Sequence, residues 1–467
     1  MVELHGLREA FAGRLLTAAD DVAPFLTDWR RLWTGTALAV VQPDSPSDVA
    51  AVIGWCAARS VPVVPQGGNT GMSGGATPDR SGRAVVVSLA RLNRVREIDP
   101  VNSTITLDAG CILQTAQEAA DSAGRFFPLS LAAEGSCTIG GNLASNAGGT
   151  AVLRYGNARE LCLGIEVATA SGALWDGLRG LRKDNSGYDL RDLYIGSEGT
   201  LGIITGAVLK LFPRPAARIT AFVAVESIES AIELLGLARE RADAALTAFE
   251  FLSEECLSLV LAHMPALRRP TETVSRWYVL IELSAAADEA QAAAPLEQLL
   301  GAAWERGLVA DAAFARSLAQ RRDFWMLREG IAEAQGALGK TIKHDVAVPI
   351  SRLPAFLAAA DAAVSARWPD VRFVTFGHLG DGNVHYNFSP APHGDQAAFL
   401  AAQDEVNRVV HDIVVAHGGT VSAEHGLGVL RRDEIAHYKS PVELDLMRAI
   451  KRALDPQGIM NPGKVLA

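Results

Sequence analysis

The sequence predicts an α+β protein, because two different strand–helix patterns meet at a proline-rich boundary. From Thr36 to about residue 212, short strands alternate with helices. The Pro-Arg-Pro segment at 213–215 interrupts the chain directly after a strand. Beyond Arg218, the order of strands and helices suggests an antiparallel sheet. We therefore expect three parts: residues 1–214, residues 215–425 and a C-terminal helical segment at 426–467.

Local patterns predict the individual elements. Residues 1–33 are expected to be helix and loop, and 45–60 a helix with its cap near Ser47 or Asp48. Residues 313–338 follow one long helical pattern. Further helices are expected up to Ala242, over about 285–307 and over 441–455. The expected strands are 37–43, 61–68, 84–89, 103–110, 164–172, 208–212, 219–227, 245–253, 276–284 and 341–349.

Composition excludes several classes of partner. The 467 residues carry a formal net charge of −10, and no stretch is polybasic, which argues against nucleic acid or an anionic membrane surface. The five cysteines are scattered without a C-x-x-C pair, which favours a reducing compartment and argues against an iron–sulfur cluster. The N-terminus lacks the pattern of a signal peptide, and no run of about 18 apolar residues suggests a membrane span. We therefore expect a cytoplasmic protein.

The most informative stretch is GHLGDGNVHYN at 377–387. Short strands are expected on both sides of its glycines, so we predict a hairpin that brings His378 and His385 to one mouth. Alternation places Val384, Tyr386 and Phe388 on one face, and His385 with Asn387 on the other. Neutral imidazoles are common ligands for divalent transition metals. A lone histidine would be an ordinary polar loop residue, but two around GDGN favour a metal or catalytic site.

Three glycine-rich loops precede residue 206, at 65–75, 134–149 and 196–205. Glycines let backbone N–H groups approach an anion closely, and Asn69 and Thr70 add side-chain donors. The loops match neither the Rossmann nor the P-loop spacing. One such loop would be an ordinary turn, whereas three point to a large dinucleotide lying across one domain.

These loops resemble the FAD-binding domain of the vanillyl-alcohol oxidase / p-cresol methylhydroxylase (PCMH) superfamily. The hairpin, the segment GGTVSAEHGLG at 418–428 and the closing DPQGIMNPGKVL resemble its FAD-linked 2-hydroxy acid dehydrogenases. The likeness extends from about Trp33 to Leu466. It implies a PCMH-type FAD-binding domain, an α+β domain that binds substrate and metal, and a C-terminal segment that completes the flavin site.

The resemblance also implies how each loop would bind FAD. The first would hold the pyrophosphate, the second would line the flavin, and the third would lie nearer the adenine, while Asn461 would return to the flavin. Some relatives attach FAD covalently through a histidine in the first loop; Asn69 stands in the loop here, so we expect noncovalent FAD. The implied contacts are Pro65, Gln66, Gly67, Gly68, Asn69, Thr70, Gly71, Gly135, Ser136, Thr138, Gly141, Asn142, Ser145, Asn146, Gly199, Ile204 and Asn461.

In this family the SAEHG motif completes the metal site. His378, His385 and Glu424 would hold a divalent metal, with Zn²⁺ favoured by the ligand types and Mn²⁺ or Co²⁺ as alternatives. His425 would act as the base that takes the proton of the substrate hydroxyl. Neighbouring residues of a strand point to opposite sides, so Glu424 and His425 converge only where the backbone is irregular, which Gly426 allows.

The substrate contacts implied by the resemblance are Arg328, Lys343, Asn387 and His425. Arg328, in the W-x-x-R-E motif, resembles a carboxylate clamp. Relatives that act on D-lactate or glycolate have a small or neutral residue at the position of Lys343, whereas those that act on D-2-hydroxyglutarate have lysine. A second cation suits a second carboxylate, since a buried anion is costly without a partner. Ala332 departs from the threonine of some such relatives.

The leading expectation is therefore oxidation of D-2-hydroxyglutarate to 2-oxoglutarate by hydride transfer to flavin N5. D-lactate or D-malate dehydrogenase is the alternative within this class, and a non-catalytic flavin-binding subunit is the alternative outside it. Because no iron–sulfur motif is present, electrons must leave for a separate acceptor, such as an electron-transfer flavoprotein or a quinone pathway. A homodimer is expected from the family alone.

Overall fold

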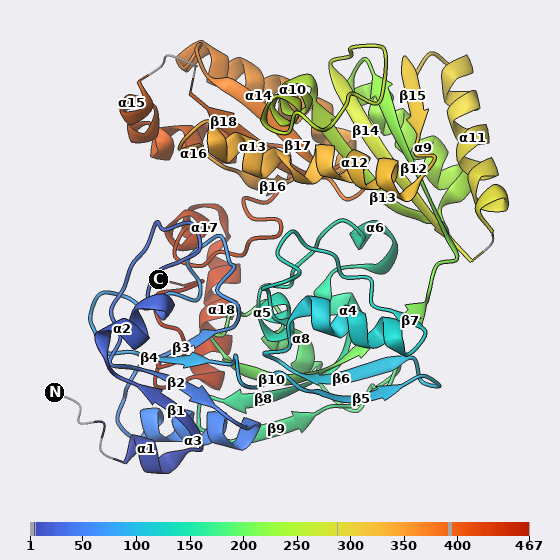
Figure 1. Ribbon diagram of the computed structural model, residues 1–467. Helices are drawn as coiled ribbons and strands as arrows, with labels where there is room; N and C mark the ends of the chain where they lie inside the picture. The colour runs from blue at the N-terminus through green and yellow to red at the C-terminus, as the bar shows by residue number, and fades with distance from the viewer. Residues whose placement is uncertain (1–3, 5, 287, 391–394, 467) are drawn as a thin grey trace. The chain divides into compact units, whose positions relative to one another are not determined.

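The computed structural model describes residues 4, 6–286, 288–390 and 395–466 (Figure 1). The chain divides into two compact units. Unit 1 comprises residues 1–149, 156–214 and 424–467, and unit 2 comprises residues 150–155 and 215–423. None of the described helices is both long and apolar enough to span a bilayer. The combination of helices with largely antiparallel sheets confirms the predicted α+β class.

Unit 1 contains two main sheets. The first has the order β1-β2-β4-β3, in which β2 and β3 run parallel to β4. Its strands are β1 (Gly13–Leu16), β2 (Ala39–Pro43), β3 (Val63–Gln66) and β4 (Val85–Ser88). The second is antiparallel in the order β5-β6-β10-β8-β9. Its strands are β5 (Val95–Asp99), β6 (Thr104–Asp108), β8 (Cys162–Thr169), β9 (Leu174–Gly177) and β10 (Gly202–Lys210).

Short helices and a small ribbon complete unit 1. The ribbon pairs β7 (Arg125–Phe126) with β11 (Phe212–Pro213). After α18 the chain returns to the first sheet, where Met460 forms a parallel bridge with Val63. The helices of unit 1 are α1 (Leu7–Ala10), α2 (Ala19–Val22), η1 (Ala23–Phe25), α3 (Pro46–Ala57), α4 (Leu113–Ser122), α5 (Ile139–Ala144), α7 (Ala158–Leu161), α8 (Leu190–Tyr194), α17 (Arg432–Tyr438) and α18 (Pro441–Leu454).

Unit 2 is built on one antiparallel sheet of seven strands in the order β15-β12-β14-β13-β17-β18-β16. The strands are β12 (Ala217–Val225), β13 (Leu246–Ser253), β14 (Trp277–Ala285), β15 (Asp311–Phe314), β16 (Asp345–Ala347), β17 (Arg372–His378) and β18 (Asn383–Ser389). The helices are α6 (Val152–Tyr155), α9 (Ile228–Ala242), α10 (Glu254–His263), α11 (Glu289–Glu305), α12 (Leu318–Glu329), α13 (Ile331–Ala337), η2 (Ile350–Arg352), α14 (Leu353–Arg367), α15 (Gln396–Ala401) and α16 (Gln403–Ala416).

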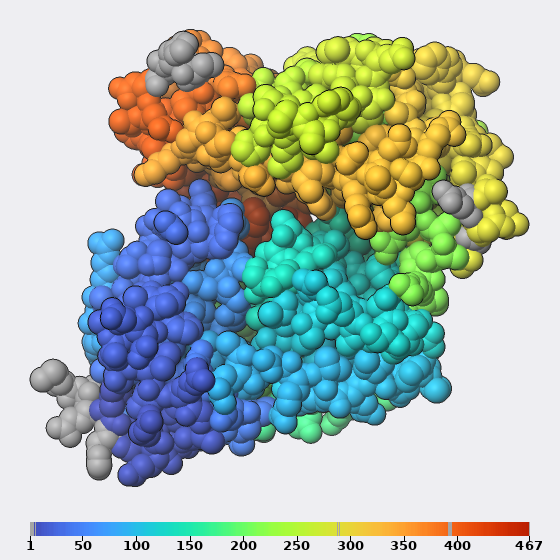
Figure 2. Space-filling model, viewed as in Figure 1, coloured from blue at the N-terminus to red at the C-terminus, as the bar shows by residue number. Residues whose placement is uncertain are grey.

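Alternation along the strands explains why helices cover both faces of this sheet. In β12, Val223 and Val225 join the core under α9, α11, α14 and α16, whereas Phe222 and Ala224 join the core under α10, α12 and α13. In Figure 2, atoms of α10, α12 and α13 lie in front of the unit 2 sheet, on the face that turns toward the viewer. Both faces of the sheet are therefore largely buried, so the polar residues on its strands are covered as well.

Three local predictions were wrong. Residues 1–33 include strand β1, which pairs with β2. The cap of α3 is Ser45, whose hydroxyl accepts from the Asp48 N–H, because Pro46 occupies the first helical turn. The expected helix over 313–338 is an edge strand followed by two helices, since β15 pairs with β12 and Gly330 separates α12 from α13. The other predicted elements are present with shifted ends; residue 287 of the predicted helix lies outside the described residues.

Candidate active site

The predicted hairpin is present as β17 and β18, which pair from Arg372 with Ser389 to His378 with Asn383. Val384, Tyr386 and Phe388 belong to the core on one face, as the alternation predicts. His378 lies at the end of β17 and His385 within β18, with their ring centroids 5.6 Å apart. The two imidazoles therefore meet at one end of the sheet of unit 2.

Glu424 joins the two histidines. Among the described residues, His378, His385 and Glu424 form a group whose potential ligand atoms all lie within 4.8 Å of one another. Glu424 follows Ala423, the last residue of unit 2, whose N–H donates to the Asp345 carbonyl at 3.2 Å. Two imidazoles and one carboxylate suit a divalent transition metal and leave positions for a substrate, so the donor set fits the predicted ion. Metal binding itself stays a prediction.

The backbone around Glu424 and His425 is irregular, as expected from Gly426. No strand or helix covers residues 422–428, and Gly426 has a φ of +71°. The Ser73 hydroxyl donates to the backbone carbonyls of His425 and Gly426, both at 3.1 Å. The carbonyl of His425 is thus anchored in unit 1.

A buried acid that the sequence did not indicate contacts His378. Glu250 of β13 is 1% exposed, and its Oε1 accepts from His378 Nδ1 at 2.8 Å. Its Oε2 lies 2.9 Å from Nη2 of Arg328, at the end of α12. Burial alone would raise the pKa of Glu250, but the charges of His378 and Arg328 outweigh burial and lower it. The group is therefore a carboxylate held between two cationic or protonatable partners.

Arg328 is itself buried, at 6% exposed. Its guanidinium lies over the Phe376 ring, 4.8 Å from the centroid. Among the described residues its Nε has no hydrogen-bond partner. A buried donor without a partner is what a clamp for a substrate carboxylate requires.

Lys343 and Asn387 both belong to unit 2. Lys343 is half-buried and stands two residues before Asp345, the first residue of β16. Asn387 is 4% exposed; its Oδ1 accepts from the His344 N–H at 3.1 Å, and its Nδ2 donates to Gln335 Oε1 at 3.2 Å. One N–H of the Asn387 amide remains for the predicted substrate contact.

The three glycine-rich loops of unit 1 meet one another. A Cβ on Gly67 would lie 2.3 Å from Thr138 Oγ1, and one on Gly68 would lie 2.0 Å from the Ser136 carbonyl oxygen. A Cβ on Gly199, which has a φ of +70°, would lie 2.7 Å from Pro65. By contrast, nothing lies within 4 Å of the Cβ position of Gly71. The first loop therefore packs against the other two and leaves open space beside Gly71.

Asn461 connects the same loops from the C-terminal segment. Its Nδ2 donates to the carbonyls of Gly75 at 2.9 Å and Glu198 at 2.8 Å. Its Oδ1 is buried without a hydrogen-bond partner among the described residues. The open space at Gly71 and this unsatisfied oxygen are features that a bound polar cofactor would complete, so the loops fit the predicted FAD.

The remaining predicted flavin contacts occupy several settings in unit 1. Thr138 caps α5 by accepting from the Gly141 N–H, and Asn142 is buried within that helix. Asn146 has a φ of +51°, and its Oδ1 accepts from the Arg159 N–H. Asn69, at a φ of +52°, donates from Nδ2 to the Thr27 carbonyl. Ile204 lies inside β10 opposite Val167. The FAD role of these residues stays a prediction.

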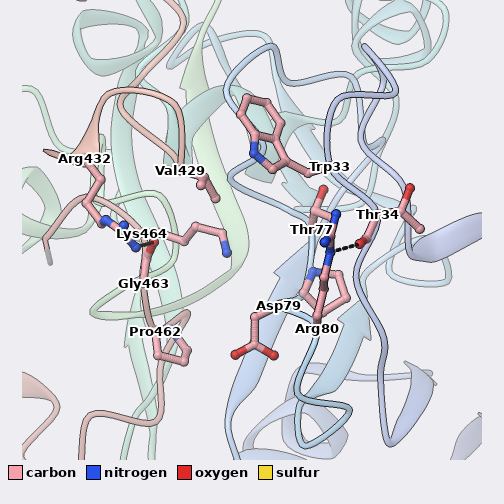
Figure 3. Close-up of a pocket in the computed structure, with 11 residues that line it drawn as sticks. Trp33, Thr34, Thr77, Asp79, Arg80, Val429, Arg432, Pro462, Gly463 and Lys464 are labelled. Atoms are coloured by element: carbon pink, nitrogen blue, oxygen red, sulfur yellow. Dashed lines mark hydrogen bonds between the residues drawn. The ribbon is translucent and has the colours of Figure 1, made fainter. Parts of the chain in front are cut away.

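Unit 1 also contains a separate pocket of about 380 Å³ (Figure 3). Figure 3 shows the Lys464 side chain extending into it. Burial lowers the pKa of Lys464, and Asp79 opposes that shift. The lining residues are Trp33, Thr34, Thr77, Pro78, Asp79, Arg80, Val429, Arg432, Pro462, Gly463 and Lys464. None of the predicted flavin contacts is among them.

The comparisons with known families define a class, that of the FAD-dependent oxidoreductases. Two family profiles match, the FAD binding domain at residues 37–177 and the C-terminal domain of FAD linked oxidases at residues 214–465. The chain belongs to the family of FAD linked oxidases, which confirms the predicted resemblance.

Its relatives include several proteins named D-2-hydroxyglutarate dehydrogenase. That of Xanthomonas citri pv. viticola is 42% identical over 97% of this chain and 94% of its own length. The mitochondrial protein of Arabidopsis thaliana is 39% identical over 94% of this chain and 77% of its own length.

Solved structures support the fold. Alkyldihydroxyacetonephosphate synthase matches with a TM-score of 0.77 and 16% identity over 98% of this chain and 84% of that chain. P-cresol methylhydroxylase matches with a TM-score of 0.75 and 16% identity over 97% of this chain and 93% of that chain. At this identity the likeness concerns the fold alone, and it confirms the predicted PCMH-type architecture.

Proposed function

We propose that this protein oxidises D-2-hydroxyglutarate to 2-oxoglutarate with FAD and a divalent metal. The observation that carries the proposal is the group of His378, His385 and Glu424 in a member of this family. The relatives named D-2-hydroxyglutarate dehydrogenase support the choice of substrate. The direct test is to mix purified protein anaerobically with a panel of D-2-hydroxy acids and record flavin bleaching. Fastest bleaching by D-2-hydroxyglutarate is expected; no bleaching by any acid would contradict the proposal.

Bound FAD supplies a hydride acceptor at N5. The first glycine-rich loop would hold its pyrophosphate with backbone N–H groups, and the second and third loops would flank the rest of the cofactor. We propose that FAD is noncovalent, because Asn69 stands in the first loop where a histidine would be needed for attachment. Acid precipitation should release all the flavin. Flavin that stays bound to the denatured protein would rule out noncovalent binding.

A bound divalent metal supplies a Lewis acid for the substrate hydroxyl, which lowers the pKa of that hydroxyl. His378, His385 and Glu424 would hold it, and Zn²⁺ suits this donor set, with Mn²⁺ or Co²⁺ as alternatives. A chelator should abolish flavin reduction while leaving FAD bound. Full activity in protein shown to be metal-free would contradict the proposed role of the metal.

His425 would take the proton of the hydroxyl as the α-hydrogen leaves as hydride. A neutral imidazole is a common general base for a hydroxyl group. His425→Ala should retain FAD but lose flavin reduction by on the order of 10²–10⁴-fold. A small effect would move the role of base to another group.

Arg328, Lys343 and Asn387 would bind and orient the acid. The unpartnered Nε of Arg328 would donate to one carboxylate, and Asn387 would donate from its remaining N–H. Lys343 would pair with the distal carboxylate of a dicarboxylic acid. Lys343→Ala should therefore raise KM for D-2-hydroxyglutarate far more than for D-lactate. Equal losses would rule out this role for Lys343. Ala332 keeps D-malate as a further candidate substrate.

A non-catalytic flavin-binding subunit is the alternative from another class. The combined presence of His378, His385, Glu424 and Arg328 argues against it. We further propose an external electron acceptor, such as an electron-transfer flavoprotein or a quinone pathway, and a homodimeric assembly. A cytoplasmic location is supported by five cysteines that are all buried and free of disulfides.

A further inference from the structure

We propose that Glu250 is a positioning residue that orients the metal ligand His378 and the carboxylate-binding Arg328 at the same time. This inference rests on the proposed function and deepens it. Glu250 lies in β13, directly opposite His378 of β17 in the antiparallel register. Both residues are buried, at 1% and 7% exposed. The register thus places one carboxylate behind two groups that would act on the same substrate.

Toward His378, the geometry selects the ligand atom. An ionised carboxylate only accepts hydrogen bonds, so Oε1 of Glu250 at 2.8 Å holds a proton on His378 Nδ1. The other nitrogen, Nε2, would then be the atom that binds the metal. A carboxylate behind a metal-binding imidazole fixes the ring orientation and raises its basicity as a ligand.

Toward Arg328, the same carboxylate forms a buried ion pair. Nη2 lies 2.9 Å from Glu250 Oε2, and the flat face of the group lies over Phe376. Neither Nε nor Nη2 has a hydrogen-bond partner among the described residues, so this edge of the guanidinium can donate to a ligand. No other acid in the described part of the chain forms an ion pair with Arg328.

A buried carboxylate could instead serve only to neutralise a buried arginine. Glu282 provides the matched control, because it is 5% exposed in the adjacent strand β14 of the same sheet. Its Oε2 lies 2.9 Å from Arg321 Nε of the same helix α12, and it also accepts from Trp325 and Thr220. None of these partners is a proposed metal ligand. Glu282→Gln should therefore affect stability without affecting metal affinity.

The experiment compares Glu250→Gln with Glu282→Gln in FAD-loaded protein. Glutamine keeps the shape but presents an N–H₂ group to either His378 or Arg328. Metal affinity, measured by competition with a chelator, should fall about 10–100-fold in Glu250→Gln and stay unchanged in Glu282→Gln. KM for D-2-hydroxyglutarate should also rise by on the order of tenfold in Glu250→Gln, as expected when one charge-assisted hydrogen bond is misaligned.

Different results would contradict the proposed function and the positioning role of Glu250. Wild-type protein that takes up metal but reduces no flavin with any acid would contradict the proposed function, while the metal titration would still test Glu250. Equal metal affinity and KM in the two variants would overturn the positioning role, whatever their stability. If Glu250→Gln does not fold, Glu250→Asp keeps the charge but shortens the reach; wild-type metal affinity and KM in that variant would overturn the role equally.

Discussion

The two units position polar groups in opposite ways. In unit 1 many of the candidate cofactor contacts lie on loops, where close backbone approach and positive φ values decide the geometry, as at Gly68, Asn69 and Asn461. In unit 2 most of the candidate site residues lie on strands or on a helix, where the position in the element decides it, as at His378 and Arg328. Unit 1 should therefore be sensitive to an added Cβ, and unit 2 to a changed side-chain donor.

The largest expected effect is the loss of flavin reduction, without loss of FAD, when a candidate metal ligand of unit 2 is removed. His385→Ala removes one imidazole from the metal group, so flavin reduction should fall by roughly three orders of magnitude, reflecting several kcal/mol of lost Lewis-acid stabilisation. FAD content should not change, because the predicted flavin contacts lie in unit 1. Metal analysis, flavin absorbance and stopped-flow reduction measure the three quantities. His263→Ala, at a surface contact with Glu333, is the control and should match wild type.

An added Cβ in unit 1 should have the converse effect. Gly68→Ala would place a Cβ 2.0 Å from the Ser136 carbonyl, so two loops must move apart at a cost of about 1–3 kcal/mol. We expect lower FAD occupancy and a lower Tm of FAD-stripped protein, measured by absorbance and thermal unfolding. Gly71→Ala sharpens the comparison, because open space surrounds that position. Its FAD-stripped protein should unfold like wild type, and only FAD affinity should fall.

Loss of the two Asn461 hydrogen bonds should also weaken FAD binding by unit 1. Asn461→Ala leaves the carbonyls of Gly75 and Glu198 without their donor, which should cost about 1–3 kcal/mol. Faster FAD release on dilution is expected, without a change in metal content. Asn102→Ala removes a single exposed bond to the Gly180 carbonyl and serves as the control. Equal rates of FAD release from both variants would contradict a role for the Asn461 hydrogen bonds in holding FAD.

The smallest effect concerns a glycine that no loop geometry requires. Gly236 is exposed within α9 of unit 2, and nothing lies within 4 Å of its Cβ position. Gly236→Ala should stabilise the protein by about 0.5–1 kcal/mol through helix propensity. Chemical denaturation measures this change. A destabilised variant would show that close backbone approach also matters outside the loops.

Much of the fold was predictable from short-range pattern. The hairpin at 377–387, its core face and the strand–helix order of both units are present as expected. The predicted long helix over 313–338 was wrong because helical periodicity does not reveal that Asp311–Phe314 pairs with β12 at the sheet edge. The cap of α3 was misplaced because two serines, Ser45 and Ser47, precede Asp48 and only Ser45 has the capping geometry.

The sequence by itself determined the family, the three glycine-rich loops and the alternation that puts His385 and Asn387 on one face. These features depend on residues close together in the chain. Only the tertiary structure decided that Glu250, 128 positions before His378, lies behind that imidazole and beside Arg328. Pairing of β13 with β17 is non-local, and a lone buried glutamate in an apolar strand carries no local signal of its partners. Tertiary structure likewise decided that Asn461 ties the loops of unit 1, because its partners come from two separate segments.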